Sequence, residues 1–150
     1  MYEFKGTLPR YYSGNVCYQY NLQKPCKSLR IRMEYMPTDR EENAKEFTEI
    51  VTQQLYKAYN RMPSEDEINT ALKGVKTEIQ LAVYLNDEFL GNIHNPSTVK
   101  DMLFDESSER TIGCIKAKPP FFGKLKIIVN SFYVIDKEVS YTVQVETEEA

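Results

Sequence analysis

His94 is the only histidine in the chain, so it is the first candidate for acid–base chemistry or metal binding. No second histidine stands at an HxH or HxxxH spacing, and a zinc site usually needs three or four ligands that converge. The three cysteines are Cys17, Cys26 and Cys114. A nucleophilic cysteine needs a base, and His94 would have to meet it in space. The pattern favours inert thiols and a His94 that caps the turn begun at Asn95.

Catalytic motifs with a fixed spacing are missing from the sequence. Glycine-rich phosphate loops and the GxSxG, HExxH and DxDxDG patterns do not occur. Neighbouring carboxylates such as Asp105 and Glu106 could serve a glycosidase, but solvated loop charge explains them more simply. We therefore expect no metal, no cofactor and a non-enzymatic binding or assembly module. A small hydrolase that uses loop carboxylates and His94 is the alternative.

Lysines and phenylalanines near residue 120 form the predicted partner surface. Alternation predicts a hairpin over residues 116–126 whose apolar side chains point inward and whose lysines point outward. Its tip would carry two phenylalanines beside the basic face, which suits an anionic ligand, a membrane surface or an acidic partner. The alternative is an edge hairpin that lysines keep soluble, with the phenylalanines folded inward. The residues concerned are Lys116, Lys118, Phe121, Phe122, Lys124 and Lys126.

Tyrosine is unusually frequent, with 11 residues and no tryptophan. Tyr11 and Tyr12 lie in a turn-like stretch, where aromatic rings could stack on a carbohydrate or anchor a protein partner. Tyrosine is also a common residue on half-buried strand faces, which explains most of the others. The expected partner is therefore a protein or a carbohydrate.

Composition sets limits on the class of protein. The 150 residues fit one domain, 1–150, and no apolar run approaches the ~20 residues that cross a membrane. The net charge of −3 makes nucleic acid a poor candidate partner. An odd number of cysteines without CxxC spacing is typical of thiols in a reducing compartment, so we expect a cytoplasmic protein.

Period-2 alternation dominates the sequence and predicts strands. It is clearest at residues 139–145, which we expect to form an antiparallel hairpin with residues 124–136. Asn86–Asp87 suits a two-residue turn between two further strands. The predicted fold is mainly β, an antiparallel jelly-roll-like β-sandwich of about seven or eight strands. The predicted strands cover residues 2–5, 16–21, 29–35, 77–85, 88–94, 111–118, 124–136 and 139–145.

A two-helix insertion is predicted at residues 39–75. Apolar residues recur every three or four positions from Ala44 to Met62, and the pairs Thr38/Glu41 and Ser64/Glu67 each have capping-box spacing. If the apolar stripe covers a sheet, Leu55→Ala costs roughly 2–5 kcal/mol of stability. If the stripe lies on the surface, it is a partner-binding helix.

Four segments carry a resemblance to a known family. They are Leu29-x-Ile-x-Met-x-Tyr-x-Pro37, Leu81–Gly91, Ser107–Gly113 and Pro119–Ile127. They resemble the N-terminal β-sandwich domain of some metal-dependent phosphoesterases of the polymerase-and-histidinol-phosphatase type. The resemblance implies a jelly-roll-like accessory domain. One histidine cannot build that family's metal cluster, and the insertion departs from its pattern.

Overall fold

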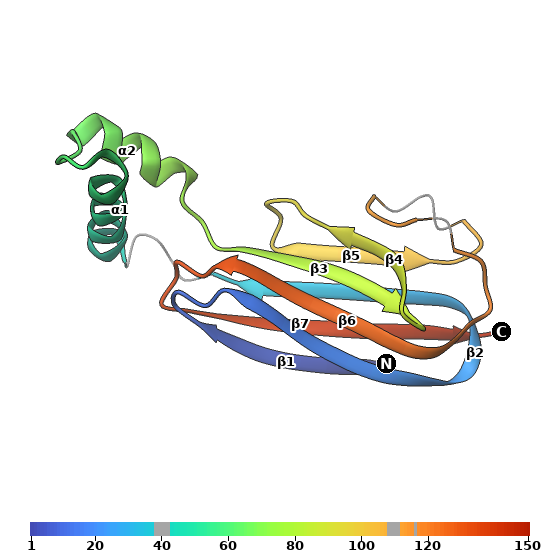
Figure 1. The fold of residues 1–150 in the computed structure, drawn as a ribbon. Coiled ribbons are helices and arrows are strands. Elements are labelled where there is room, and N and C mark those ends of the chain that lie inside the picture. The colour runs from blue at the N-terminus through green and yellow to red at the C-terminus, as the bar shows by residue number, and fades with distance from the viewer. Residues whose placement is uncertain (38–42, 108–111, 116) are drawn as a thin grey trace.

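Seven antiparallel strands and two helices make up the part of the protein that the structure describes, which confirms the predicted mainly β sandwich with a helical insertion. The computed structural model describes residues 1–37, 43–107, 112–115 and 117–150. Figure 1 shows the strands as a layered body with both helices at one end. The elements are β1 (Tyr2–Pro9), β2 (Gly14–Met36), α1 (Ala44–Tyr59), α2 (Glu65–Gly74), β3 (Glu78–Leu85), β4 (Glu88–Ile93), β5 (Val99–Phe104), β6 (Phe121–Tyr133) and β7 (Glu138–Glu149).

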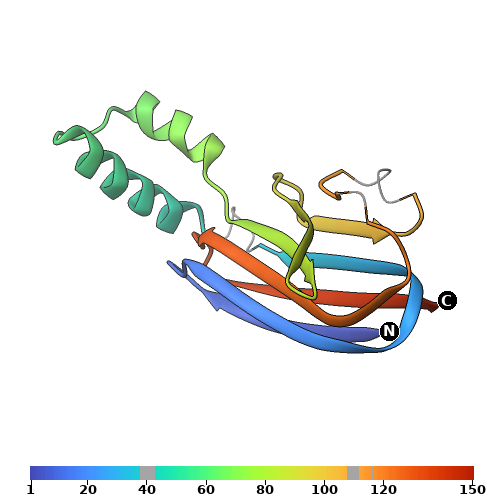
Figure 2. The ribbon, with the colours of Figure 1, turned by 45° about the vertical axis from the view of Figure 1, so that its right-hand side comes forward.

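The long strand β2 belongs to both halves of the sheet. Its residues 14–22 and Cys26 pair with β6, whereas residues 26–36 pair with β7, and part of this second stretch also pairs with β5. The register shifts between Leu22 and Cys26, where the strand bends round (Figure 2). The strand order is β1-β7-β2-β6-β3-β4, and inward side chains from both halves share one core. The two separate strands predicted for residues 16–21 and 29–35 are therefore one continuous strand.

Strand pairing corrects one predicted hairpin and bears out another. β6 and β7 do not pair with each other, because β2 lies between them. Side-chain alternation reports which face of a strand is buried but not which strand is its neighbour, so the prediction was wrong. The β3–β4 hairpin is present, and Asn86 and Asp87 have φ values of 52° and 66°. Positive φ at both turn residues is the signature of a type I′ turn.

The strand predicted for residues 111–118 is also wrong. Its described residues make a single isolated bridge, between Gly91 and Cys114. The missing strand is β5, which pairs with residues 29–34 of β2. Pro119 and Pro120 have no backbone N–H to give to a sheet, so regular pairing begins after them, at Phe121.

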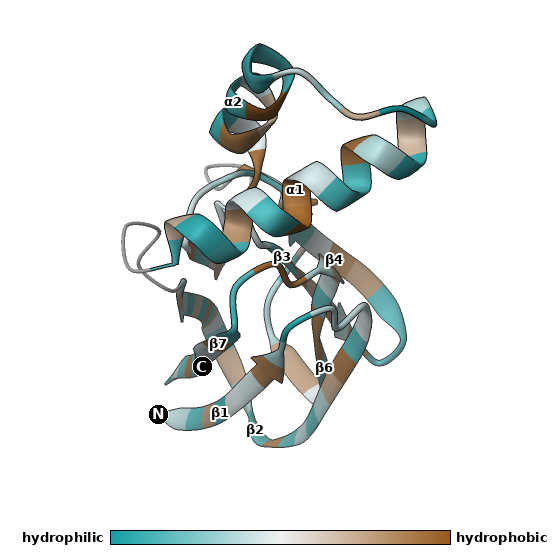
Figure 3. Cartoon of the chain, turned by 90° about the vertical axis from the view of Figure 1, so that its left-hand side faces the viewer, coloured by the Kyte–Doolittle hydropathy of each residue, from teal (hydrophilic) through white to brown (hydrophobic). Residues whose placement is uncertain are grey.

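The two helices form a hairpin that projects from one end of the strands and covers neither half of the sheet (Figures 1 and 3). Only Phe47, Ile50 and Val51 of α1 are buried, and α2 has no buried residue. The predicted capping box at α2 is present: Ser64 Oγ accepts from the Glu67 N–H at 3.2 Å, and Glu67 Oε1 accepts from the Ser64 N–H at 3.0 Å. The predicted box at Thr38 and Glu41 lies outside the described residues.

Candidate functional site

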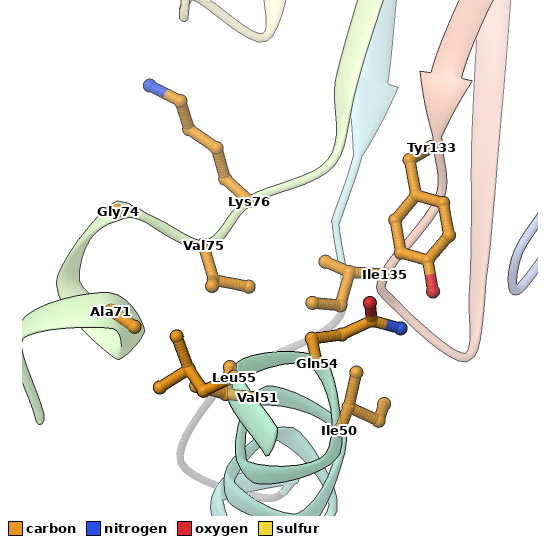
Figure 4. Close-up of a pocket in the computed structure, with 10 residues that line it drawn as sticks. All are labelled: Ile50, Val51, Gln54, Leu55, Ala71, Gly74, Val75, Lys76, Tyr133 and Ile135. Carbon is orange, nitrogen blue, oxygen red and sulfur yellow. The ribbon is translucent and has the colours of Figure 1, made fainter. Parts of the chain in front are cut away.

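An apolar cleft of about 430 Å³ lies where the helical hairpin leaves the strands. Its volume falls within the range of small-ligand and peptide-anchor pockets, roughly 300–1,000 Å³. In Figure 4, Leu55 and Val51 of α1 lie close to Val75, which follows α2, and Ile135 lies beside them. The cleft is lined by Ile50, Val51, Gln54, Leu55, Ala71, Gly74, Val75, Lys76, Tyr133 and Ile135.

Ile135 is the apolar side chain that the strand end contributes, and hydrogen bonds hold both its backbone groups. Its N–H donates to Thr77 Oγ1 at 3.1 Å, and its carbonyl accepts from Arg10 Nε at 2.9 Å. The Thr77 hydroxyl also donates to the buried carboxylate of Asp136. A buried loop needs such partners for its polar groups. They fix the position from which Ile135 packs against Phe47.

The first turn of α1 is tied to the same loop by an ion pair. The guanidinium of Arg10 donates to the carboxylate of Glu46, next to the carbonyl of Ile135 that it also binds. The hydrogen bond from Arg10 is the main cause that lowers the pKa of the Glu46 carboxyl. One arginine therefore connects β1's end, the loop after β6 and the helical hairpin.

The second helix completes the wall of the cleft. Leu72 and Val75 pack against the small cluster formed by Phe47, Ile50 and Ile135. Val75 is the residue at which α2 ends, with an extended backbone. The chain then enters β3 at Glu78, so only three residues separate the end of α2 from the sheet. The cleft is bounded by elements anchored at their bases.

Polar groups are few on the cleft wall, and Lys76 is the only charged residue among those that line it. Its ammonium lies 3.9 Å from the Glu78 carboxylate, and Figure 4 shows its side chain directed away from Leu55. The Tyr133 ring packs at 5.7 Å, between centroids, from that of Tyr11. Further apolar side chains are exposed outside the lining: Tyr11, Tyr56, Tyr59, Met62 and Phe132.

The described residues do not form the predicted hairpin over residues 116–126 with its face of lysines. Lys116 lies outside the described residues, and Lys118 is exposed but belongs to no strand. Lys124 and Lys126 lie on β6, and both ammonium groups face Asp87, at 3.1 and 3.5 Å. Opposite charge therefore compensates the repulsion expected between them.

The aromatic residues of the predicted site lie in different environments. Phe121 is 1% exposed in the main core, so it cannot contact a partner. Phe122 is 52% exposed at the start of β6. Tyr12 packs against the main core and donates its hydroxyl to the Asn15 carbonyl at 3.4 Å. Only Tyr11, through Tyr133, adjoins the cleft.

His94 lies beside a carboxylate, but it does not line the cleft. Its Nε2 lies 3.5 Å from Glu78, and both side chains are partly exposed. Asn95, rather than His94, caps the following turn by accepting from the Ser97 N–H at 3.0 Å. Asp105 similarly accepts from the Ser107 N–H at 2.6 Å. In the part of the chain that the structure describes, no three His, Cys, Asp or Glu side chains converge as metal ligands.

A buried lysine, Lys100, was missed by sequence reasoning. Its side chain lies on the inner face of β5, and its ammonium donates to the carbonyls of Asn95 and Ser97 and to the Asn95 side chain. The ammonium also lies 5.4 Å from the centroid of the Tyr35 ring. Burial lowers the pKa of Lys100. Period-2 alternation across residues 99–104 could have placed Lys100 on the inner face. A lysine in a strand is normally expected at the surface, so the sequence alone did not indicate its burial.

Comparison with known proteins shows the family but not an activity. The chain belongs to a family of unknown function, DUF6669, which matches residues 1–150. No curated protein matches it. Neither described helix is long and apolar enough to cross a membrane.

Two solved structures share a remote likeness with the chain. One is PliG of Aeromonas hydrophila, a periplasmic inhibitor of g-type lysozyme. It is 10% identical with a TM-score of 0.41, over 98% of this chain and 85% of PliG. The other is a protein from Sulfurospirillum deleyianum, 10% identical with a TM-score of 0.39, over 97% of this chain and 98% of that one. Likenesses this remote carry no argument about function.

Proposed function

We propose that the chain is a non-enzymatic protein-binding module whose site is the cleft between the helical hairpin and the strand end. The observation that carries this proposal is the apolar cleft itself, in which Leu55 and Val75 are half-buried while Val51 and Ile135 are buried at its base. Tyr56 and Tyr59 of α1 are also exposed, and exposed Tyr11 packs against Tyr133 at the border of the cleft. Exposed apolar and tyrosine-rich surfaces are typical of protein interfaces.

The chemistry of the wall supports a proposal about the partner segment. Aliphatic side chains line most of the cleft, which suits apolar anchors of a peptide and offers little to a carbohydrate. Lys76 lies at its border, and the flanking Glu78 leaves it only a weak, exposed ion pair. We therefore expect a segment with two or three apolar side chains and an acidic residue beside them.

The proposed location is the cytoplasm. All three cysteines are free thiols, and Cys17 is exposed on β2. Exposed thiols persist in reducing compartments and are oxidised or paired elsewhere. A fusion that carries a redox-sensitive fluorescent reporter would test this location directly.

A library of random peptides displayed on phage tests the binding function. We expect selection on the parent protein to enrich apolar peptides with an acidic residue. Leu55→Glu introduces a charge into the cleft and should weaken the selected peptides at least tenfold. Lys57→Glu, on the exposed side of α1, is the matched control and should bind like the parent. Far-UV circular dichroism checks that both variants keep their helices.

Two results would contradict the proposal. One is a selection that yields no peptide specific for the parent protein. The other is a set of peptides that bind Leu55→Glu as tightly as the parent, which would place their contacts elsewhere on the surface.

A further inference from the structure

Residues 14–22 of β2, here called the open edge, have a hydrogen-bonded neighbour on one side only. They pair with β6, whereas the pairings of β2 with β7 and β5 lie at Cys26 and beyond. β1 precedes the open edge in the chain but pairs with β7. In the described structure, β1 meets the open edge through side chains, such as Phe4 stacked on Tyr18 with 4.7 Å between centroids. Figure 1 shows both blue strands at the same margin of the protein.

The open edge lacks the features that normally keep a strand edge single. Edge strands are usually protected by charged side chains, proline or a bulge. From Tyr11 to Gln23 the sequence has no charged residue and no proline. The pairing with β6 runs without a register shift from Gly14 to Leu22. The exposed outward row of the open edge consists of the small or amide side chains of Asn15, Cys17, Gln19 and Asn21.

Two other margins of the sheet, at β1 and β4, are protected. β1 carries Glu3 and Lys5 and ends at Pro9. β4 is covered by a segment that bridges to it at Cys114, where the Ile115 N–H donates to the Leu90 carbonyl at 2.8 Å. The contrast with these two margins makes the open edge a place where another strand can add.

We infer that the open edge pairs with the open edge of a second copy of this chain, antiparallel and about a two-fold axis at Tyr18. An uncharged strand has no charge with which to select a charged peptide of another protein. Two copies of the same uncharged strand do not repel each other. With the axis at Tyr18, the two open edges overlap along their whole length, and Asn15 of one copy lies opposite Asn21 of the other. Amide side chains both donate and accept, so such a pair is self-complementary. A two-fold contact also closes, so it gives a dimer and not a filament.

The size of the contact sets the expected affinity. The open edge is roughly 30 Å long at ~3.3 Å per residue. One pair of strands buries less than the ~1,200 Å² of a standard interface, so we expect a dimer with a dissociation constant on the order of 10–100 µM. The dimer should therefore form reversibly and depend on concentration.

Sedimentation equilibrium with charge variants at Gln19 tests this inference. The measurement uses the full chain up to about 500 µM with a reducing agent, so that exposed Cys17 thiols form no disulfide. The parent should dimerise, and Gln19→Lys and Gln19→Glu should each weaken self-association at least tenfold, because two like charges would lie close to the axis. An equimolar mixture of the two variants should restore dimers. Thr7→Lys, on the protected edge of β1, is the matched control and should dimerise like the parent.

Three outcomes would overturn the inference: a parent that stays monomeric at 500 µM, charge variants that dimerise like the parent, or a mixture that restores nothing. Because Gln19 is exposed, we expect the variants to fold, and their thermal melting checks this. Hydrogen exchange gives an independent measurement, since amides of the open edge should exchange more slowly as the parent's concentration rises.

Discussion

Replacing Phe47 by alanine should separate the stability of the helical hairpin from that of the strands. Phe47 is 4% exposed in a small cluster with Ile50 and Ile135, which is distinct from the main core. Truncating a buried phenylalanine costs roughly 3–5 kcal/mol. The stability lost on Phe47→Ala cannot exceed the free energy that holds the hairpin against the strands. Once that free energy is lost, the hairpin is detached and Phe47 has no further contact to lose.

That limiting free energy can be estimated from the cluster. Its three side chains contribute about 1.5–3 kcal/mol each by burial, from which the entropy of ordering the hairpin must be subtracted. The Arg10–Glu46 pair adds little, because its carboxylate is partly exposed. A net docking free energy of a few kcal/mol is smaller than, or similar to, the cost of Phe47→Ala, so we expect the hairpin to open locally.

Hydrogen exchange followed by mass spectrometry measures this opening. A loss of about 3 kcal/mol corresponds to roughly 100-fold faster exchange in α1 and α2. Urea unfolding of the strands should change by less than about 0.5 kcal/mol. The control is Leu81→Ala, which removes a fully buried side chain from the main core and should cost the strands about 2–5 kcal/mol. If Phe47→Ala destabilises the strands as much as Leu81→Ala does, the two clusters form one cooperative core and the reasoning is refuted.

Three further predictions concern polar groups. The Arg61 guanidinium and the Ser64 N–H lower the pKa of Glu67 from 4.5 to about 2. The stability that Glu67 gives to α2 is therefore fully present above about pH 4.5 and is lost as the pH falls toward 2. Circular dichroism should show a loss of helix over this pH range, and Glu67→Gln should lack this transition. Lys100→Met leaves the part-buried carbonyls of Asn95 and Ser97 without this donor and should lower the free energy of unfolding by about 1–3 kcal/mol in urea. Titration with Zn²⁺ should give no stoichiometric site that His94→Ala removes, and calorimetry would detect one in the micromolar range.

Local signals in the sequence predicted those parts of the fold that depend on neighbouring residues. The β3–β4 turn follows from Asn86–Asp87, whose types tolerate positive φ, and the start of α2 follows from the Ser64/Glu67 spacing. The apolar stripe of α1 was visible as well. These features rest on contacts within a few residues, so the sequence alone contains their cause.

Features that depend on distant contacts could not be predicted in this way. Alternation in residues 124–133 is the same whether β2 or β7 is the neighbour, so the pairing had to come from the fold. The same alternation placed Lys124 outward but could not reveal Asp87 beside it. The cleft depends on Ile135, a residue just beyond a strand, meeting a helix far away in the chain. Nothing local to Ile135 marks it as part of a site.

The two proposed surfaces together imply a bivalent molecule. The cleft uses α1, α2 and Ile135, whereas the open edge uses residues 14–22, so one surface need not block the other. A two-fold dimer would present two clefts, and a partner displayed densely on a surface would engage both. The second contact is then intramolecular and adds avidity, although neither cleft gains a new interaction. Gln19→Lys should therefore leave the affinity for a free peptide unchanged and weaken the binding to a densely immobilised one. Equal weakening in both formats would instead mean that the open edge contributes to the cleft itself.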